Sequence, residues 1–259
     1  MITDRYTSPA CPPWLMRFLK QTGLGINKFG MIKNGDSVLL GISGGKDSLS
    51  LALALSLRRK WLPISYTLRA AIVEWKQFPI KPADKNAISC FLAELDIDHD
   101  FLVRDMFPAS FRGKFNCYLC SRNRKRILFE EADRLDIKKI ALGHHLDDIA
   151  ETTLINLCLR GNFSTMMPVQ SFFKGKVFIV RPLCMVREST VSLVASRLSL
   201  PCYALACPHH ETNLRLRIKP YIKELSRIDP RVREHIFAAH WNINGEYSDY
   251  ANIAHEILE

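Results

Sequence analysis

Short apolar segments alternate with longer, partly apolar segments along the chain, and this pattern predicts strands separated by helices. The predicted strands are Ser37–Ile42, Tyr66–Glu74, His99–Arg104, Lys138–Gly143 and Val177–Arg181. The predicted helices are Pro12–Phe29 (broken around Gly23 and Gly25), Leu49–Arg59, Ala83–Leu95, Cys120–Leu135, Leu146–Arg160 and Arg187–Leu198, followed by basic helical segments between Asn213 and Trp241. The segment Gly161–Lys176 contains two glycines and a proline and is predicted to be a loop.

Strands joined by single helices predict a Rossmann-like α/β fold with a parallel sheet covered on both faces. We expect three parts: an N-terminal helical segment (residues 1–33), the α/β domain (34–200), and a cysteine-containing loop with a basic helical C-terminal extension (201–259). Ligands of such sheets bind beyond the carboxyl ends of the strands. Two polar junctions, Gly41–Ser48 and Gly143–Asp148, follow predicted strands, so we place the active site between them.

The string Ser43-Gly44-Gly45-Lys46-Asp47-Ser48 follows a buried-type strand and opens a predicted helix. Glycines let the backbone approach a phosphate, and the helix N-terminus and Lys46 add positive charge. Asp47 indicates that a divalent cation, such as Mg²⁺, is shared with the phosphates. The spacing is that of neither a Walker A loop nor a dinucleotide-binding loop. The alternative is a simple strand-to-helix turn.

A second polar junction places Asp147, Asp148 and Glu151 in the first turns of one predicted helix. Carboxylates at this end of a helix suit its dipole, so they could simply cap it. The alternative is that Asp147 binds Mg²⁺ or positions the acceptor. His144 and His145 could contact nucleotide or RNA, although a lone histidine is more often structural.

The eight cysteines are expected to be thiols, metal ligands or redox groups. The first residues lack the apolar core of a secretory signal, and no apolar run reaches about 18 residues, so we expect a cytoplasmic protein without a membrane span. Cys117 and Cys120 precede a basic helix and fit an iron–sulfur or zinc site, a redox pair or two inert thiols. Cys202 and Cys207 are the candidate additional ligands. The remaining four (Cys11, Cys90, Cys158 and Cys184) are expected to be small core residues.

Several of these strings resemble one known family. Ser43–Ser48 resembles the SGGxDS loop of the PP-loop ATP pyrophosphatases, whose fold is of the adenine nucleotide alpha hydrolase type. Gly143–Asp148, followed by Glu151 and Thr152, resembles the GHHxDDxxET segment of the tRNA-modifying members. The Cys-x-x-Cys pair, the later single cysteine and the string Arg181-Pro182-Leu183 are similar to tRNA 2-thiocytidine synthetases, over roughly Lys33–Arg217.

This resemblance implies cleavage of ATP between its α- and β-phosphates, adenylation of the C2 carbonyl of a cytidine (position 32 of the tRNA anticodon loop), and replacement of that oxygen by sulfur. It implies a [4Fe-4S] cluster on Cys117, Cys120 and Cys207, although the wider spacing of the late cysteines lets Cys202 replace or join Cys207. The implied nucleotide-binding residues are Ser43, Gly44, Gly45, Lys46, Asp47, Ser48, Gly143 and His144, and the implied catalytic residues are Asp47, Asp147, Cys117 and Cys207. A cysteine desulfurase or another sulfur donor is the implied partner, and related enzymes often form homodimers.

The charge balance supports a polyanionic partner. Lys and Arg number 36 against 26 Asp and Glu, a net charge of +10. Two runs, Arg104–Arg126 and Asn213–His235, each contain seven Lys or Arg, and Phe111, Phe115 and Tyr118 could stack on bases. The predicted RNA-contacting residues are Arg112, Lys114, Arg122, Arg124, Lys125, Arg126, Arg215 and Arg217. A solvated basic face with core aromatics is the alternative.

Three functions therefore compete. The first is ATP-dependent tRNA thiolation. The second is a PP-loop enzyme that thiolates or amidates another nucleoside or a small molecule. The third is a non-catalytic iron–sulfur or RNA-binding protein, against which the presence of Lys46, Asp47, Ser48 and Asp147 argues.

Overall fold

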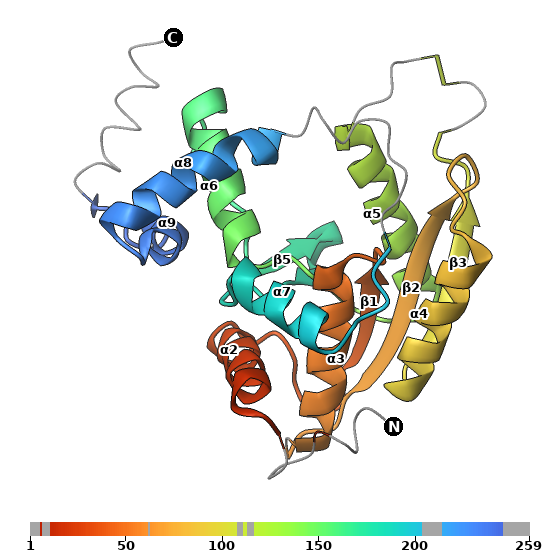
Figure 1. Ribbon diagram of the computed structural model, residues 1–259. Helices are drawn as coiled ribbons and strands as arrows, with labels where there is room; N and C mark the ends of the chain where they lie inside the picture. The colour runs from red at the N-terminus through yellow and green to blue at the C-terminus, as the bar shows by residue number, and fades with distance from the viewer. Residues whose placement is uncertain are drawn as a thin grey trace. The chain divides into compact units, whose positions relative to one another are not determined.

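A computed structural model describes residues 6, 11–61, 63–107, 111–112, 117–203 and 214–245, with only the backbone for Cys117 (Figure 1). The chain divides into two compact units. Unit 1 combines Met1–His145 with Met167–Thr212, and unit 2 combines Leu146–Met166 with Asn213–Glu259. The boundaries predicted near residues 33 and 200 stay predictions.

Unit 1 contains the sheet. Its strands are β1 (Ser37–Ile42), β2 (Thr67–Trp75), β3 (Asp98–Arg104), β4 (Lys139–Leu142), β5 (Val169–Phe172) and β6 (Val177–Val180). Its helices are α2 (Pro13–Lys28), α3 (Lys46–Trp61), α4 (Pro82–Glu94), α5 (Cys117–Arg134) and α7 (Glu188–Arg197), with the short 3₁₀ helix η1 (Phe173–Gly175). Unit 2 contains α6 (Leu146–Arg160), α8 (Leu214–Ile228) and α9 (Val232–Ala239).

The strand order is β3-β2-β1-β4-β6-β5, and every neighbouring pair is parallel except β5 with β6. This confirms the predicted α/β class with a mostly parallel sheet. The chain moves from β1 to β2 on one side and later adds β4 on the other side, so the direction of winding reverses between β1 and β4. Such a reversal leaves a crevice at the carboxyl ends of the two strands, where ligands of these folds bind.

The core of unit 1 lies on both faces of the sheet. Leu39, Val73 and Ile140 are buried against Ile127 and Leu128 of α5. Alternation along each strand turns the intervening residues to the opposite face. That face is covered by α3, whose apolar residues from Leu49 to Leu57 are buried (Figure 1). Because α3 packs through its own buried side chains, its first turn is held in place at the end of β1.

The predicted break in the first helix is wrong, because α2 runs without interruption from Pro13 to Lys28. Its two glycines are sites of close approach. A Cβ atom at Gly23 would lie 2.2 Å from Nη1 of Arg58, which donates a hydrogen bond to the carbonyl oxygen of Leu19. A Cβ atom at Gly25 would lie 3.2 Å from Sγ of Cys184. Both glycines therefore serve packing inside a continuous helix.

The prediction of a loop over Gly161–Lys176 is also wrong in part, because this segment contains β5 and η1. β5 pairs with β6 in antiparallel register, and η1 forms the turn between them. Lys174 and Gly175 have positive φ angles of 56° and 88°. The turn residues therefore mark a hairpin at the edge of the sheet. Among the residues that the structure describes, no helix is long and apolar enough to cross a bilayer.

Candidate active site

The phosphate loop, residues 43–48, connects β1 to α3 and is held by its own hydroxyl groups. Ser48 Oγ accepts a hydrogen bond from the backbone nitrogen of Ser43 (3.1 Å) and donates one to the carbonyl oxygen of Gly45 (3.0 Å). Ser43 Oγ lies 3.2 Å from Ser48 Oγ. Gly44 has φ +79°, a conformation that favours glycine. The serines thus shape the loop, and the backbone N–H groups that begin α3 are left to bind an anion.

Charged side chains gather at the start of α3. Nζ of Lys46 lies 3.0 Å from Oδ1 of Asp47 and 3.2 Å from Oε1 of Glu188, the first residue of α7. Oδ1 of Asp47 also lies 3.6 Å from Nε2 of the buried His145. Burial alone would lower the pKa of Lys46, but the two carboxylates raise it above its usual value. Lys46 is therefore firmly cationic.

The second predicted junction meets the phosphate loop. Gly143 directly follows β4, and a Cβ atom there would lie 2.8 Å from the carbonyl carbon and oxygen of Asp47 and from the backbone nitrogen of Ser48. Only glycine allows this approach. β1 and β4 are neighbours, so both junctions lie at the reversal point of the sheet. His144, the next residue, is half-buried.

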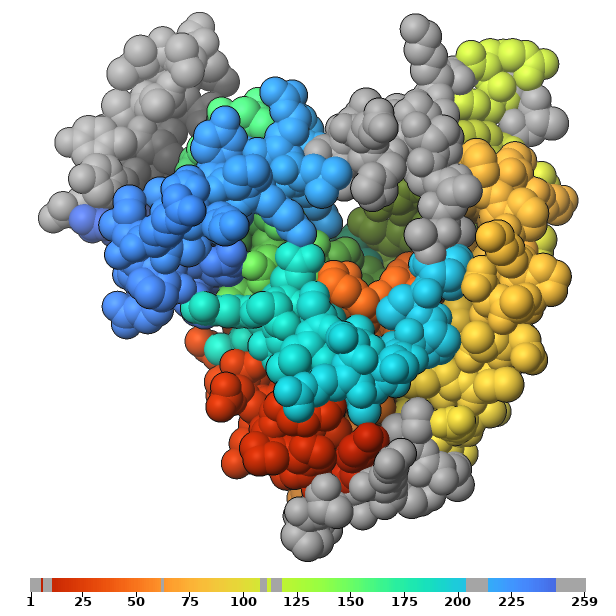
Figure 2. Space-filling model, in the orientation of Figure 1, coloured from red at the N-terminus to blue at the C-terminus, as the bar shows by residue number. Residues whose placement is uncertain are grey.

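A segment after α7 lies against the phosphate loop. The backbone nitrogen of Tyr203 donates a hydrogen bond to the carbonyl oxygen of Gly44 (3.0 Å), and a Cβ atom on Gly44 would lie 1.8 Å from Cε1 of the Tyr203 ring. In Figure 2 the start of α3 (orange) reaches the surface beside this segment (light blue). Cys202 is an exposed residue, but partial desolvation of its sulfur and the charge of Asp47 raise the pKa of its thiol, partly offset by Lys46. The Cys202 thiol thus belongs to the residue next to Tyr203, which contacts the loop.

The predicted cysteine ligands fall partly outside the described residues. Cys117 begins α5, one turn earlier than predicted, and Cys120 is a half-buried free thiol. Positions 117 and 120 are three residues apart in a helix and share one face of it. Cys207 lies outside the described residues. Among the described side chains no group of three His, Cys, Asp or Glu is placed to hold a metal ion. Of the four cysteines expected in the core, Cys184 is buried and Cys11 is half-buried, whereas the prediction is wrong for Cys90 and Cys158, which are exposed.

Three acidic residues in the first turns of α6 are each paired with a basic residue of α8 or α9. The buried Asp147 accepts a hydrogen bond from Arg233 Nε. Oδ1 of Asp148 lies 3.0 Å from Nη1 of Arg215, and Oε1 of the buried Glu151 lies 3.9 Å from Nζ of Lys219. These pairs support the alternative that the carboxylates are structural. The catalytic role of Asp147 stays a prediction.

The predicted RNA-contacting residues divide by exposure. Arg112, Arg122, Arg126 and Arg217 are exposed, although Arg126 pairs with Glu130 at 3.2 Å. Arg124 and Lys125 are half-buried over the rings of Trp75 and Phe172, and Arg215 is half-buried against Asp148. Lys114 and Phe115 lie outside the described residues. Phe111 stacks on Phe107 with ring centroids 4.3 Å apart, whereas Tyr118 is 71% exposed.

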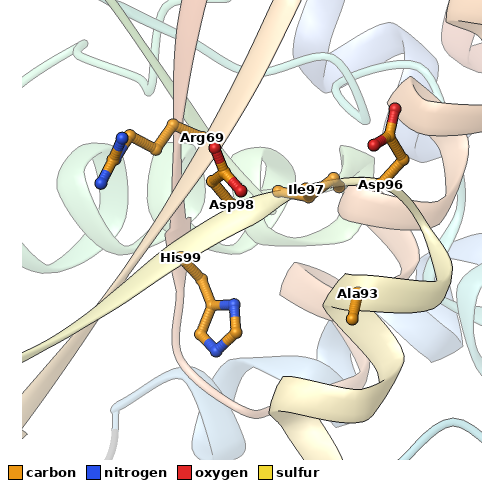
Figure 3. A pocket seen from close by; sticks show the side chains of 6 residues that line it. All are labelled: Arg69, Ala93, Asp96, Ile97, Asp98 and His99. Atoms are coloured by element: carbon orange, nitrogen blue, oxygen red, sulfur yellow. The ribbon is translucent and has the colours of Figure 1, made fainter.

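A separate pocket lies at the opposite, amino-terminal edge of the sheet (Figure 3). Its lining residues are Arg69, Ala93, Asp96, Ile97, Asp98 and His99. They come from the start of β2, the end of α4, the following turn and the start of β3. The side chains of the phosphate loop are far from this edge, because that loop follows the carboxyl end of β1. The pocket is therefore not part of the candidate active site.

The sequence does not predict the roles of two residues of this site. The sequence places Glu188 only in a predicted helix, and Tyr203 only in a segment between two cysteines. Glu188 lies 142 positions from Lys46, so local spacing gives no sign of their contact. Glu188 does begin a helix that follows Arg181-Pro182-Leu183, and a carboxylate at a helix start is the one available signal.

Comparisons with known proteins identify the family of this chain. Residues 18–203 match the PP-loop domain family. The tRNA-cytidine(32) 2-sulfurtransferase of Cupriavidus necator is 33% identical over 232 residues, which is 88% of this chain and 73% of that protein. The protein of the same name from Alkalilimnicola ehrlichii is 34% identical over 229 residues, 86% of this chain and 71% of that protein.

Among solved structures, the U34-tRNA thiolase NcsA from Methanococcus maripaludis with its [4Fe-4S] cluster has the same fold. Its TM-score is 0.75 at 23% identity, and the match covers 90% of this chain and 82% of that one. The fold and the family match thus agree. The chain belongs to the PP-loop domain family, in which its curated relatives are tRNA-cytidine(32) 2-sulfurtransferases.

Proposed function

We propose that this protein is an ATP-dependent tRNA sulfurtransferase that converts a cytidine, at position 32 of the anticodon loop, to 2-thiocytidine. One observation carries the proposal. The hydrogen bond from Tyr203 to Gly44 fixes the chain beside Cys202 onto the phosphate loop, and Cys207 follows Tyr203 by only four residues. The phosphate loop and a cysteine-bearing segment are thereby joined, which suits a reaction in which ATP activates a substrate that then receives sulfur.

The reaction has two displacement steps. The C2 carbonyl oxygen of cytidine attacks the α-phosphorus of ATP, and the bond to the bridging oxygen of the β-phosphate breaks, which releases pyrophosphate. A sulfur nucleophile then attacks C2, and the C–O bond to AMP breaks. Activation of this kind depends mainly on positioning and on neutralising charge on the phosphates. The N–H groups at the start of α3 and the Lys46 ammonium supply that charge to the leaving pyrophosphate.

The proposed reaction also involves a metal ion and an iron–sulfur cluster. Asp47 fits a Mg²⁺ ion shared with the phosphates, because a carboxylate at the start of the helix otherwise opposes anion binding. Cys117, Cys120 and Cys207, or Cys202 in place of Cys207, would hold a [4Fe-4S] cluster, which supplies an open iron for sulfide when it is bound. The free thiol of Cys120 and the placement of Cys117 on the same helix face fit such a cluster. A cysteine desulfurase or another donor would deliver the sulfur. A cytoplasmic location and a homodimer stay predictions.

The adenylation step is tested by tRNA-dependent release of pyrophosphate. Purified protein is incubated anaerobically with Mg²⁺, ATP and unmodified tRNA, and pyrophosphate is measured with and without the tRNA. We expect tRNA to stimulate release, and Lys46→Ala and Asp47→Asn to reduce it by at least about tenfold. A tRNA whose cytidine 32 is replaced by uridine is the matched substrate control. Equal pyrophosphate release without tRNA would overturn the proposed substrate, and no release under any condition would overturn the proposed chemistry.

A further inference from the structure

Lys46 is held by carboxylates from two separate elements. Asp47 is its neighbour in the first turn of α3, and Glu188 is the first residue of α7, a helix that packs against α3. The contacts of Nζ are 3.0 Å to Oδ1 of Asp47 and 3.2 Å to Oε1 of Glu188. The ammonium group is therefore fixed from two directions.

This arrangement contributes little to folding. The side chains of Lys46, Asp47 and Glu188 are each about one-third exposed, so solvent screens these ion pairs and they add little to stability. A free lysine side chain has several rotatable bonds, and fixing it costs conformational entropy. If the protein fixes Lys46 before ATP arrives, the nucleotide does not bear that cost when it binds.

We propose that Glu188 is a positioning residue that holds the Lys46 ammonium in place for the phosphates of ATP. Asp47 alone does not define the position of the ammonium, because the two adjacent side chains extend from the same helical turn and can move together. Glu188 adds a contact from a second, packed helix. The inference rests on the proposed use of ATP, but it concerns nucleotide binding alone and does not depend on tRNA or on sulfur.

A double-mutant cycle on nucleotide affinity tests this role. The probe is the Mg²⁺ complex of α,β-methylene-ATP, which resists cleavage at the α–β position, and Kd is measured by titration calorimetry without tRNA. The variants are Glu188→Gln, Lys46→Met and the double variant. We expect Glu188→Gln to weaken binding about threefold to tenfold when Lys46 is present, and not to weaken it when Lys46 is replaced by Met.

The matched control is Asp136→Asn. This substitution also removes one negative charge, but at an exposed turn before β4, at the opposite edge of the sheet, where asparagine suits the positive φ of 52°. We expect its Kd to equal that of the unsubstituted protein, and melting temperatures of all variants show whether they fold.

Three outcomes would overturn the inference. Equal weakening by Glu188→Gln in both backgrounds would mean that Glu188 acts independently of Lys46. Tighter binding in the Lys46 background would mean that Glu188 opposes the phosphates. An unchanged Kd in that background would mean that Asp47 suffices. If no form of the protein binds the nucleotide, both the inference and the proposed function fail. Normal nucleotide binding without tRNA-dependent pyrophosphate release overturns only the proposed function.

Discussion

The ring of Tyr203 lies directly on the backbone of Gly44. No side chain fits between them, because a Cβ atom on Gly44 would be 1.8 Å from Cε1 of the ring. The backbone nitrogen of Tyr203 also donates a hydrogen bond to the carbonyl oxygen of Gly44. The segment after α7 is therefore fitted to the phosphate loop by packing and by a hydrogen bond. Burial raises the pKa of Tyr203 to about 12, so its phenol stays neutral.

Replacing Gly44 by alanine should therefore damage nucleotide binding beyond its effect on the backbone. The positive φ of 79° costs about 1–2 kcal/mol with any Cβ, and the clash with Tyr203 displaces the ring or the loop. Gly35→Ala is a matched control, because Gly35 has φ +81° and a Cβ atom there would meet no other atom within 4 Å. We expect both variants to lose the stability that the positive φ costs, but only Gly44→Ala to weaken ATP binding, by about tenfold or more. Equal affinities in calorimetry would show that the contact does not matter.

Unit 2 should depend on the pair formed by Asp147 and Arg233. The Asp147 carboxylate is buried, so Arg233→Ala removes a cationic partner from a buried charge and should cost about 3–5 kcal/mol of the free energy of unfolding of unit 2. Arg231→Ala serves as a control, because its side chain is 73% exposed and its contact with Asp229 is 3.8 Å long. That substitution should cost about 0–1 kcal/mol. Urea unfolding of both variants measures the difference, and similar losses would contradict the structural role of Asp147.

Stability should fall at high pH because of Tyr66. Burial raises its pKa to about 12, and its hydroxyl donates a 2.7 Å hydrogen bond to the carbonyl oxygen of Leu55. An unfolded tyrosine ionises near pH 10, so between about pH 10 and 12 the unfolded state loses a proton that the folded state keeps. The free energy of unfolding should therefore drop by up to about 1.4 kcal/mol per pH unit in this window.

The substitution Tyr66→Phe should remove the part of the pH dependence of the free energy of unfolding that comes from Tyr66. At neutral pH it should lower the free energy of unfolding by about 1 kcal/mol through the lost hydrogen bond. Tyr118→Phe is the control, since this side chain is 71% exposed. Denaturant unfolding from about pH 9 to about pH 12 gives the slopes. If Tyr66→Phe and Tyr118→Phe have the same slope, the ionisation of Tyr66 is not linked to folding.

Two arginines on α8 should have different roles. Arg217 is exposed, so Arg217→Ala should weaken tRNA binding and lower the slope of log Kd against log salt concentration by about one. Arg215 contacts Asp148 and Thr152, so Arg215→Ala should act mainly on the stability of unit 2. Filter binding between about 50 and about 300 mM salt, combined with melting temperatures, separates the two effects. A normal salt slope for Arg217→Ala would remove Arg217 from the interface.

The fold and the phosphate loop were predictable because their signals are local. Buried strands read as short apolar runs, and the glycines and charges of residues 43–48 stand in consecutive positions. Glu188 and Tyr203 were not predictable, because their contacts depend on where α7 and the following segment pack in three dimensions. Gly23 shows the same limit: the sequence suggests a helix break, whereas the structure uses the glycine to admit Arg58.

Nucleoside mass spectrometry is the decisive test of whether ATP cleavage drives the transfer of sulfur to cytidine in tRNA. Reconstituted protein is incubated anaerobically with ATP, Mg²⁺, a sulfur donor and unmodified tRNA, and the tRNA is digested and mapped by position. We expect 2-thiocytidine at position 32, formed only with ATP and absent with Lys46→Ala. Unmodified cytidine at that position in every reaction, despite pyrophosphate release, would contradict this expectation.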